Sequence, residues 1–137
     1  MKISPLSQFT VQRLSLISDK PFQKVESIVK PALGPTGLME FGEFDDGAFI
    51  RKDRGEITPR SMRLLIGNPL IMKRMTELVP DAAAYAPVTV LIDEREGKVH
   101  VSYDRMASLL SVYNNPGATK IAEALDAKIE TLIRAAL

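Results

Sequence analysis

Cysteine is absent from the 137 residues, and His100 is the only histidine. Disulfides, thiolate zinc sites, iron–sulfur clusters and cysteine nucleophiles all require cysteine, so the sequence excludes them. A single histidine also disfavours a metal site made of several histidines, or a serine–histidine triad, within one chain. We therefore expect no metal and no cofactor.

The sequence also lacks an excess of charge of one sign, because 18 Lys and Arg residues face 17 Asp and Glu residues, for a formal net charge of +1. Nucleic-acid binding draws on many uncompensated phosphate contacts, so we expect no nucleic-acid partner. No apolar run is long enough to span a bilayer, and polar residues interrupt residues 1–20 too often for a signal peptide. We expect a cytoplasmic protein without a membrane partner, folded as a single domain over residues 1–137.

The first third of the chain predicts a strand and then a helix. Residues 9–17 are rich in β-formers and predict the strand. The run Ser18-Asp19-Lys20-Pro21 is typical of a helix start, with cap-forming side chains and a proline in the first turn. Pro31 and Gly34-Pro35 predict the end of this helix.

Strands and a short helix are expected next. Residues 38–44 and 48–52 predict two strands around the turn Asp45-Asp46-Gly47. Residues 62–66 predict a third strand, followed by a short helix over residues 69–78. The segment between Val79 and Pro87 predicts a loop with one helical turn.

A hairpin is the clearest pattern in the sequence. Apolar and polar residues alternate over residues 88–92 and again over residues 99–103, and residues 93–97 form a charged turn that ends in glycine. A helix is expected to start near Asp104, and a long final helix over residues 118–136. The order β-α-β-β-β-α-β-β-α-α predicts an α+β two-layer sandwich, in which a mostly antiparallel sheet packs on helices.

Gly67-Asn68-Pro69 joins the strand at residues 62–66 to the following helix. Asn favours the N-cap of a helix and Pro the position after it, so a structural corner explains the motif. A helix start can also hold an anion, but the multiple glycines and the lysine of a phosphate-binding loop are missing. We favour the structural corner, with a ligand site as the alternative.

The charged residues form two further groups that could carry chemistry. Glu40, Glu43, Asp45 and Asp46 could act as acid and base or hold a hard cation, although water-exposed turn residues are the simpler interpretation. A basic patch is conceivable, but acids dilute it and no aromatic residue interleaves, so a solvated face is favoured. The basic residues concerned are Arg51, Lys52, Arg54, Arg60, Arg63, Lys73 and Arg74.

His100 lies on the hairpin face that carries Lys98 and Ser102, opposite the face of Val99 and Val101. In an antiparallel sheet the polar face is often exposed to water, so an ordinary surface histidine is the first interpretation. If the sheet instead curves around a cavity, the same face could supply a group that takes up and releases a proton.

The segments RLLIGNPLIM and VTVLIDEREGKVHVSY together resemble the domain of unknown function 302 family of small bacterial and archaeal proteins. The resemblance runs in order of elements from about Phe9 to about Leu110. It implies a compact α+β fold of the helix-grip type, similar in shape to halves of the TATA-binding protein, often in a homodimer, and it implies no enzyme activity. Many relatives carry Asp-His where this chain has Asp45-Asp46, which argues against a histidine-based role here.

These features favour a non-enzymatic homodimeric module that binds a small ligand or a protein partner. Its pocket is expected between the sheet and the helices near Asn68, with no catalytic residue and no metal ligand. The expected ligand-binding residues are Gly67, Asn68, His100, Tyr103 and Asp46. One alternative is a small hydrolase- or isomerase-like enzyme that uses the acidic residues with His100. Another is a purely structural interaction domain, which would show a large apolar surface patch and no pocket.

Overall fold

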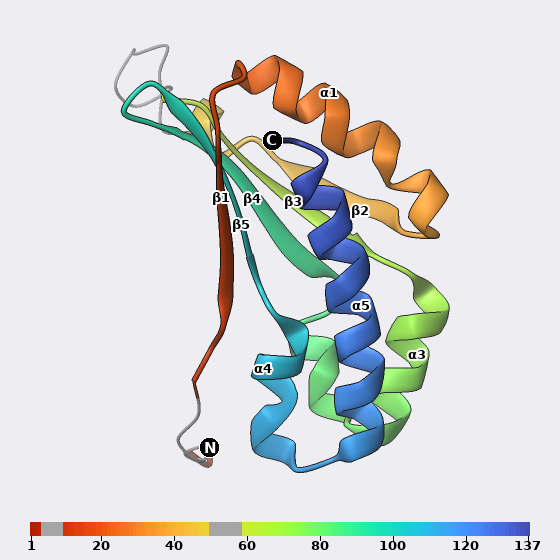
Figure 1. Ribbon diagram of the computed structural model, residues 1–137. Helices are drawn as coiled ribbons and strands as arrows, with labels where there is room; N and C mark the ends of the chain where they lie inside the picture. The colour runs from red at the N-terminus through yellow and green to blue at the C-terminus, as the bar shows by residue number, and fades with distance from the viewer. Residues whose placement is uncertain (4–9, 50–58) are drawn as a thin grey trace.

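The computed structural model describes residues 1–3, 10–49 and 59–137. Five antiparallel strands form one sheet in the order β1-β5-β4-β3-β2, and the helices gather on one of its faces (Figure 1). The α+β sandwich predicted from the sequence is confirmed. The elements are β1 (Arg13–Ser18), α1 (Phe22–Ala32), η1 (Gly34–Thr36), β2 (Met39–Phe44), β3 (Ser61–Gly67), α3 (Pro69–Leu78), η2 (Pro80–Ala84), β4 (Val88–Arg95), β5 (Lys98–Asp104), α4 (Met106–Leu110), η3 (Ser111–Tyr113) and α5 (Pro116–Arg134).

The hydrophobic core lies between the sheet and the helices. Alternate residues of the three central strands are buried on this side, among them Leu64, Val90 and Val101, as the period of two requires. The long helix α5 lies over the sheet and buries Leu125, Ile129 and Leu132, among others, against it. None of the helices that the structure describes is long and apolar enough to cross a membrane.

The hairpin of β4 and β5 forms as the alternation predicts. Glu96 and Gly97 have φ values of 52° and 78°, the left-handed conformation that a tight two-residue turn needs. Helix α3 begins at Pro69, with Asn68 as its N-cap, and so confirms the corner predicted from Gly67-Asn68-Pro69.

Three boundaries near the N-terminus differ from the prediction. Of the strand predicted over residues 9–17, residue 9 lies outside the described part of the chain, and the strand begins only at Arg13. The Gln12 backbone bonds to the chain around α4: its N–H donates to Ser108 Oγ and its carbonyl accepts from the Arg105 N–H. Helix α1 begins at Phe22 with Pro21 as its N-cap, and no side chain caps it because proline carries no side-chain acceptor. Ser18 is buried instead, where its hydroxyl donates to the Ala136 carbonyl and accepts the Lys20 N–H. Pro31 lies within the last turn of α1, which ends only at Ala32.

The strand predicted over residues 48–52 is also wrong where the structure describes it. Residues 46–49 form a helical turn, and residues 50–52 lie outside the described part of the chain. Asp45 explains the difference, because its Oδ1 accepts the Ala48 N–H at 2.9 Å and caps that turn. The acidic pair thus starts a helical turn after β2, and the strand that pairs with β2 is β3.

Candidate functional site

Asn68 is fully used in holding the strand-to-helix corner together. Its Oδ1 accepts from the N–H groups of Leu70 at 2.9 Å and Ile71 at 3.2 Å, and its Nδ2 donates to the Gly37 carbonyl at 2.9 Å. Gly67 is buried, and an added Cβ there would lie 3.4 Å from both Met72 Sδ and a ring carbon of Phe41. The corner is therefore closed by protein contacts.

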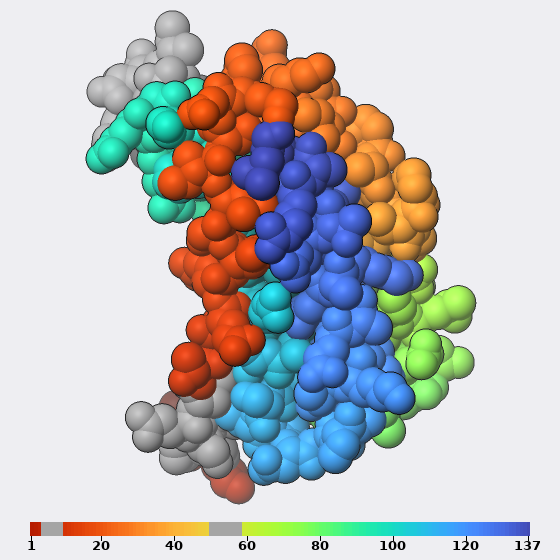
Figure 2. Space-filling model, in the orientation of Figure 1, coloured from red at the N-terminus to blue at the C-terminus, as the bar shows by residue number. Residues whose placement is uncertain are grey.

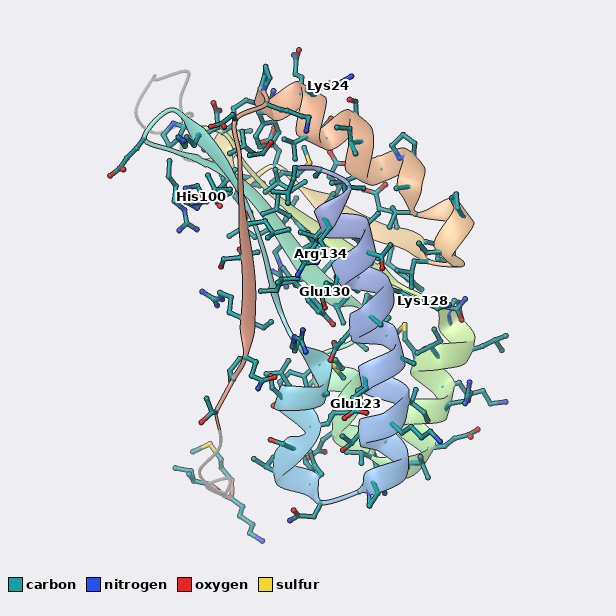
Figure 3. The ribbon with its side chains drawn as sticks, in the orientation of Figure 1. Lys24, His100, Glu123, Lys128, Glu130 and Arg134 are labelled. Carbon is teal, nitrogen blue, oxygen red and sulfur yellow. The ribbon has the colours of Figure 1, made fainter. Side chains whose placement is uncertain are left out.

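Tyr103 and His100 lie on opposite faces of the sheet. Tyr103 is 2% exposed on the helix side, with the side chains of Val99 and Val101, whereas His100 is half-buried on the other face and points away from the helices (Figure 3). Asp46 follows β2, three strands from β5, or roughly 14 Å at the usual strand spacing. The structure therefore does not bring the sequence-predicted site residues together.

The face of the sheet that turns away from the helices, here called the open face, is mostly polar. The strand registers place its side chains in rows that cross neighbouring strands. One row runs from Ser15 through Ser102, Leu91 and Arg63 to Phe44, and a neighbouring row contains Arg13, Asp104, Thr89 and Leu65. His100 belongs to the next row, with Ile17, Asp93 and Ser61.

A hollow of about 430 Å³ lies on the open face, where the sheet meets the segment around η2 and α4. This volume is within the range of small-molecule sites. Arg13 and Arg63 stand at opposite sides, three strand spacings apart, and the strand residues between them form the floor. The lining residues are Arg13, Arg63, Ala84, Tyr85, Pro87, Val88, Thr89, Leu91, Ser102, Tyr103, Asp104 and Leu109.

The two arginines of the hollow differ in their pairing. Arg13 makes two hydrogen bonds to the Asp104 carboxylate, Nε to Oδ1 at 2.6 Å and Nη2 to Oδ2 at 3.0 Å, which raise the pKa of Arg13. Arg63 donates from Nε to Thr89 Oγ1 at 3.2 Å, and its guanidinium lies over the Phe44 ring at 5.9 Å. Among the described residues no carboxylate pairs with Arg63, so its positive charge is available to a ligand.

A buried polar network supports the hollow from the helix side. Tyr103 donates its hydroxyl to Asp126 Oδ1 at 2.5 Å, and Asp126 also accepts the backbone N–H groups of Met106 at 2.8 Å and Ala107 at 3.1 Å. Burial raises the pKa of Asp126, against these hydrogen bonds, which lower it. Burial and the Asp126 charge raise the pKa of Tyr103, so the phenol keeps its proton at neutral pH. The network fixes the end of β5 and the start of α4 beside the hollow.

The acidic run does not form a metal site or an acid–base pair with His100. No group of three or more His, Asp or Glu residues that could hold a metal is found within residues 1–3, 10–49 and 59–137. Glu43 pairs with Lys30 of α1 at 2.6 Å, on the helix side of edge strand β2. His100 is on the other face and three strands away, which removes the convergence that the hydrolase or isomerase alternative needs.

The sequence did not predict that the residues of the hollow come together, although the strand pattern indicated the face on which some of them lie. Arg13, Arg63 and Asp104 occupy polar positions in alternating strands, which predicts the open face. Their meeting depends on the strand order β1-β5-β4-β3, a non-local property that single-strand patterns do not contain.

Comparisons with known proteins give a family and a fold. The sequence model of a family described as domain of unknown function DUF302 matches residues 14–136. The crystal structure of an uncharacterized conserved protein DUF302 from Bacillus stearothermophilus is similar, with a TM-score of 0.83 and 11% sequence identity over 91% of this chain and 98% of that one. At this identity the similarity concerns the fold alone. No curated protein matches the chain.

Proposed function

The chain belongs to the domain of unknown function DUF302 family, and we propose that it is a binding module for a small anionic molecule, which it holds in the hollow of the open face. The observation that carries this proposal is the guanidinium of Arg63, which faces a hollow of ligand size without a carboxylate partner among the described residues. A guanidinium forms strong, oriented hydrogen bonds to a carboxylate or a phosphate.

The other lining groups favour a ligand with one anionic group and a partly apolar body. Because Asp104 neutralises Arg13, the hollow offers a single uncompensated positive charge. Ser102, Thr89 and Tyr85 supply hydroxyl groups that can donate or accept, and Leu91 and Pro87 supply apolar contact. Such a mixture of apolar walls and a few polar groups is typical of small-molecule binding sites.

Calorimetric titration of a panel of small carboxylates and phosphates, chosen first by thermal shift, tests the proposal. Arg63→Gln should weaken binding of the best compound about tenfold or more, because a charge-assisted hydrogen bond is lost. Lys24→Gln removes one exposed positive charge on α1, away from the hollow, so it is the control and should bind as the wild type does. Equal binding by wild type and Arg63→Gln, or no binding by any compound of the panel, would contradict the proposal.

The homodimer and the cytoplasmic location stay predictions. Native mass spectrometry of protein purified from its host can measure the subunit number and detect a retained small molecule in one experiment. A mass of two chains is expected. A lone chain at micromolar concentration would contradict the dimer without affecting the ligand site, which a single chain forms by itself.

A further inference from the structure

A second concave surface, here called the α3–α5 groove, runs between two helices on the far side of the molecule from the open face. Figure 2 shows α3 and α5 side by side on this surface. The groove has a volume of about 530 Å³. Its residues come from one stripe of each helix: Ile71, Arg74 and Leu78 of α3, and Lys120, Ile121 and Lys128 of α5.

Small residues of α5 keep the α3–α5 groove open. Gly117 and Ala124 line it, and a Cβ added at Gly117 would lie 3.2 Å from Leu78 Cδ1. Leu78 is 46% exposed and Leu70, at the start of α3, is 70% exposed, so large apolar side chains remain accessible beside the groove. The floor of the groove is therefore apolar and leaves room for a partner's side chains.

All the charged residues that line the groove are positive. Arg74 and Lys120 pair with no carboxylate among the described residues, and Lys128 donates to the Thr36 carbonyl at 3.0 Å. Figure 3 shows Lys128 on the side of α5 that faces α3, with Glu123 and Glu130 on its other side. At about 100° per residue, Glu123 and Glu130 lie roughly 60° and 80° around the helix from Lys120, on the side away from the rest of the groove stripe, and neither lines the groove.

From these observations we propose that the α3–α5 groove docks an amphipathic helix of a partner protein whose apolar stripe is bordered by Asp and Glu residues. The charges of the groove favour this partner. Three cations border an apolar floor, and no carboxylate is among the residues that line the groove, so acidic side chains on the partner would complement it. The groove runs from Gly117 to Lys128, roughly 16 Å, which matches about three turns of a partner helix.

The positions of the cations specify the partner further. Lys120 and Lys128 are about 12 Å apart along α5, so acidic residues seven or eight positions apart on the partner helix would reach both. Arg74 stands on the opposite border and pairs with an acid on the other edge of the partner stripe. A flat membrane surface would contact the cations at the borders and leave the concave apolar floor unfilled, so a helix is the better match.

The test uses a fluorescein-labelled helical peptide of 18 residues, with leucines at every third and fourth position and glutamates on both edges of that stripe. Fluorescence polarisation should give saturable binding to the full chain, and a peptide with lysine in place of glutamate should bind at least tenfold more weakly. Arg74→Glu/Lys120→Glu should weaken binding of the acidic peptide tenfold or more. The control Lys2→Glu/Lys24→Glu changes the net charge equally at exposed positions outside the groove and should bind as the wild type does.

A second variant separates docking in the groove from general charge attraction. Ala124→Phe fills the floor at an exposed position without changing charge, and it should also weaken binding of the acidic peptide tenfold or more. Absence of binding, equal binding of both peptides, or full binding by Ala124→Phe would overturn the proposal. Two further results would also overturn the proposal. One is binding of the wild type to vesicles of phosphatidylcholine and phosphatidylglycerol that Ala124→Phe abolishes while peptide binding persists. The other is self-association of the wild type that Ala124→Phe abolishes in the same way.

Discussion

At the scale of one residue, Asn68 is a polar side chain whose hydrogen bonds stabilise the fold. Substitution by Ala removes the acceptor of two N–H groups and the donor to Gly37, and should lower the free energy of unfolding by about 1–2 kcal/mol. Asn68→Asp keeps the acceptor and adds a negative charge that the helix N-terminus favours, but it sets a carboxylate oxygen against the Gly37 carbonyl. Because both cap bonds remain, its loss of stability should be smaller than that of Asn68→Ala. Urea denaturation followed by circular dichroism measures both variants. An Asn68→Ala protein as stable as the wild type would show that the corner does not depend on the cap.

Tyr103 stabilises the protein through a single hydroxyl group. Tyr103→Phe keeps the ring in the core but leaves the buried Asp126 carboxylate with one partner fewer, which should cost about 2 kcal/mol. Tyr85→Phe, a half-buried tyrosine at the border of the hollow, is the control and should change the free energy of unfolding by less than about 0.5 kcal/mol. The same denaturation measurement decides, and equal losses for both variants would argue against a special role of the Tyr103–Asp126 bond.

At the scale of elements, the sequence correctly predicted the features that contacts between neighbouring residues determine. Gly67-Asn68-Pro69 predicted the end of β3 and the start of α3, because the cap is formed within three residues. The alternation over residues 88–103 predicted the hairpin for the same reason. The predicted strand was wrong at residues 48–49, its described part, because Asp45 can start a helical turn as readily as a hairpin turn, and composition alone does not distinguish them.

The candidate site was less predictable because it depends on which strands are neighbours. The alternation of β5 was sufficient to place His100 and Tyr103 on opposite faces, and a pocket lined by both was inconsistent with that pattern. Arg13 and Asp104 are 91 residues apart in the chain and meet only because β1 pairs with β5. Sequence patterns define the faces of strands, and the tertiary fold decides which faces share a hollow.

The contact between α1 and β2 predicts a pH dependence of stability. The hydrogen bond from Lys30 lowers the pKa of Glu43, so the contribution of Glu43 to stability is present above the usual glutamate pKa of about 4.3 and is lost as pH falls through its lowered value. Glu43→Gln should therefore cost about 0.5 kcal/mol at pH 7 and progressively less below about pH 4.3. Urea denaturation across pH 3 to 7 measures this difference.

Glu40, which lies beside Glu43 on the same strand, is expected to have the opposite pH dependence. Burial and a hydrogen bond to Glu43 raise the pKa of Glu40, so its ionisation destabilises the folded protein as pH rises through that raised value. The stability of the wild type relative to Glu40→Gln should therefore decrease with rising pH, whereas relative to Glu43→Gln it should increase. If both differences have the same sign, the Lys30–Glu43 pair does not account for the pH dependence.

At the scale of the whole molecule, the hollow and the α3–α5 groove lie on opposite sides of the core. The hollow is on the open face of the sheet, and the groove is on the solvent side of the helix layer. Between them lie buried side chains such as Leu64, Val90 and Ile129. Two ligands are coupled only if binding of one changes the conformation that the other recognises. A densely packed core between distant sites does not by itself provide a second conformation of this kind.

The two sites should therefore act independently. The affinity for the best compound of the carboxylate and phosphate panel should be the same with and without saturating acidic peptide, within about twofold by calorimetry. Arg63→Gln should weaken binding of the small molecule only, and Lys120→Glu binding of the peptide only. In the double variant each ligand should therefore show the same change as in the corresponding single variant. A change of affinity larger than about fivefold in one site when the other is filled would show that binding alters the sheet or the helix layer as a whole, and by linkage the effect would be equal in both directions.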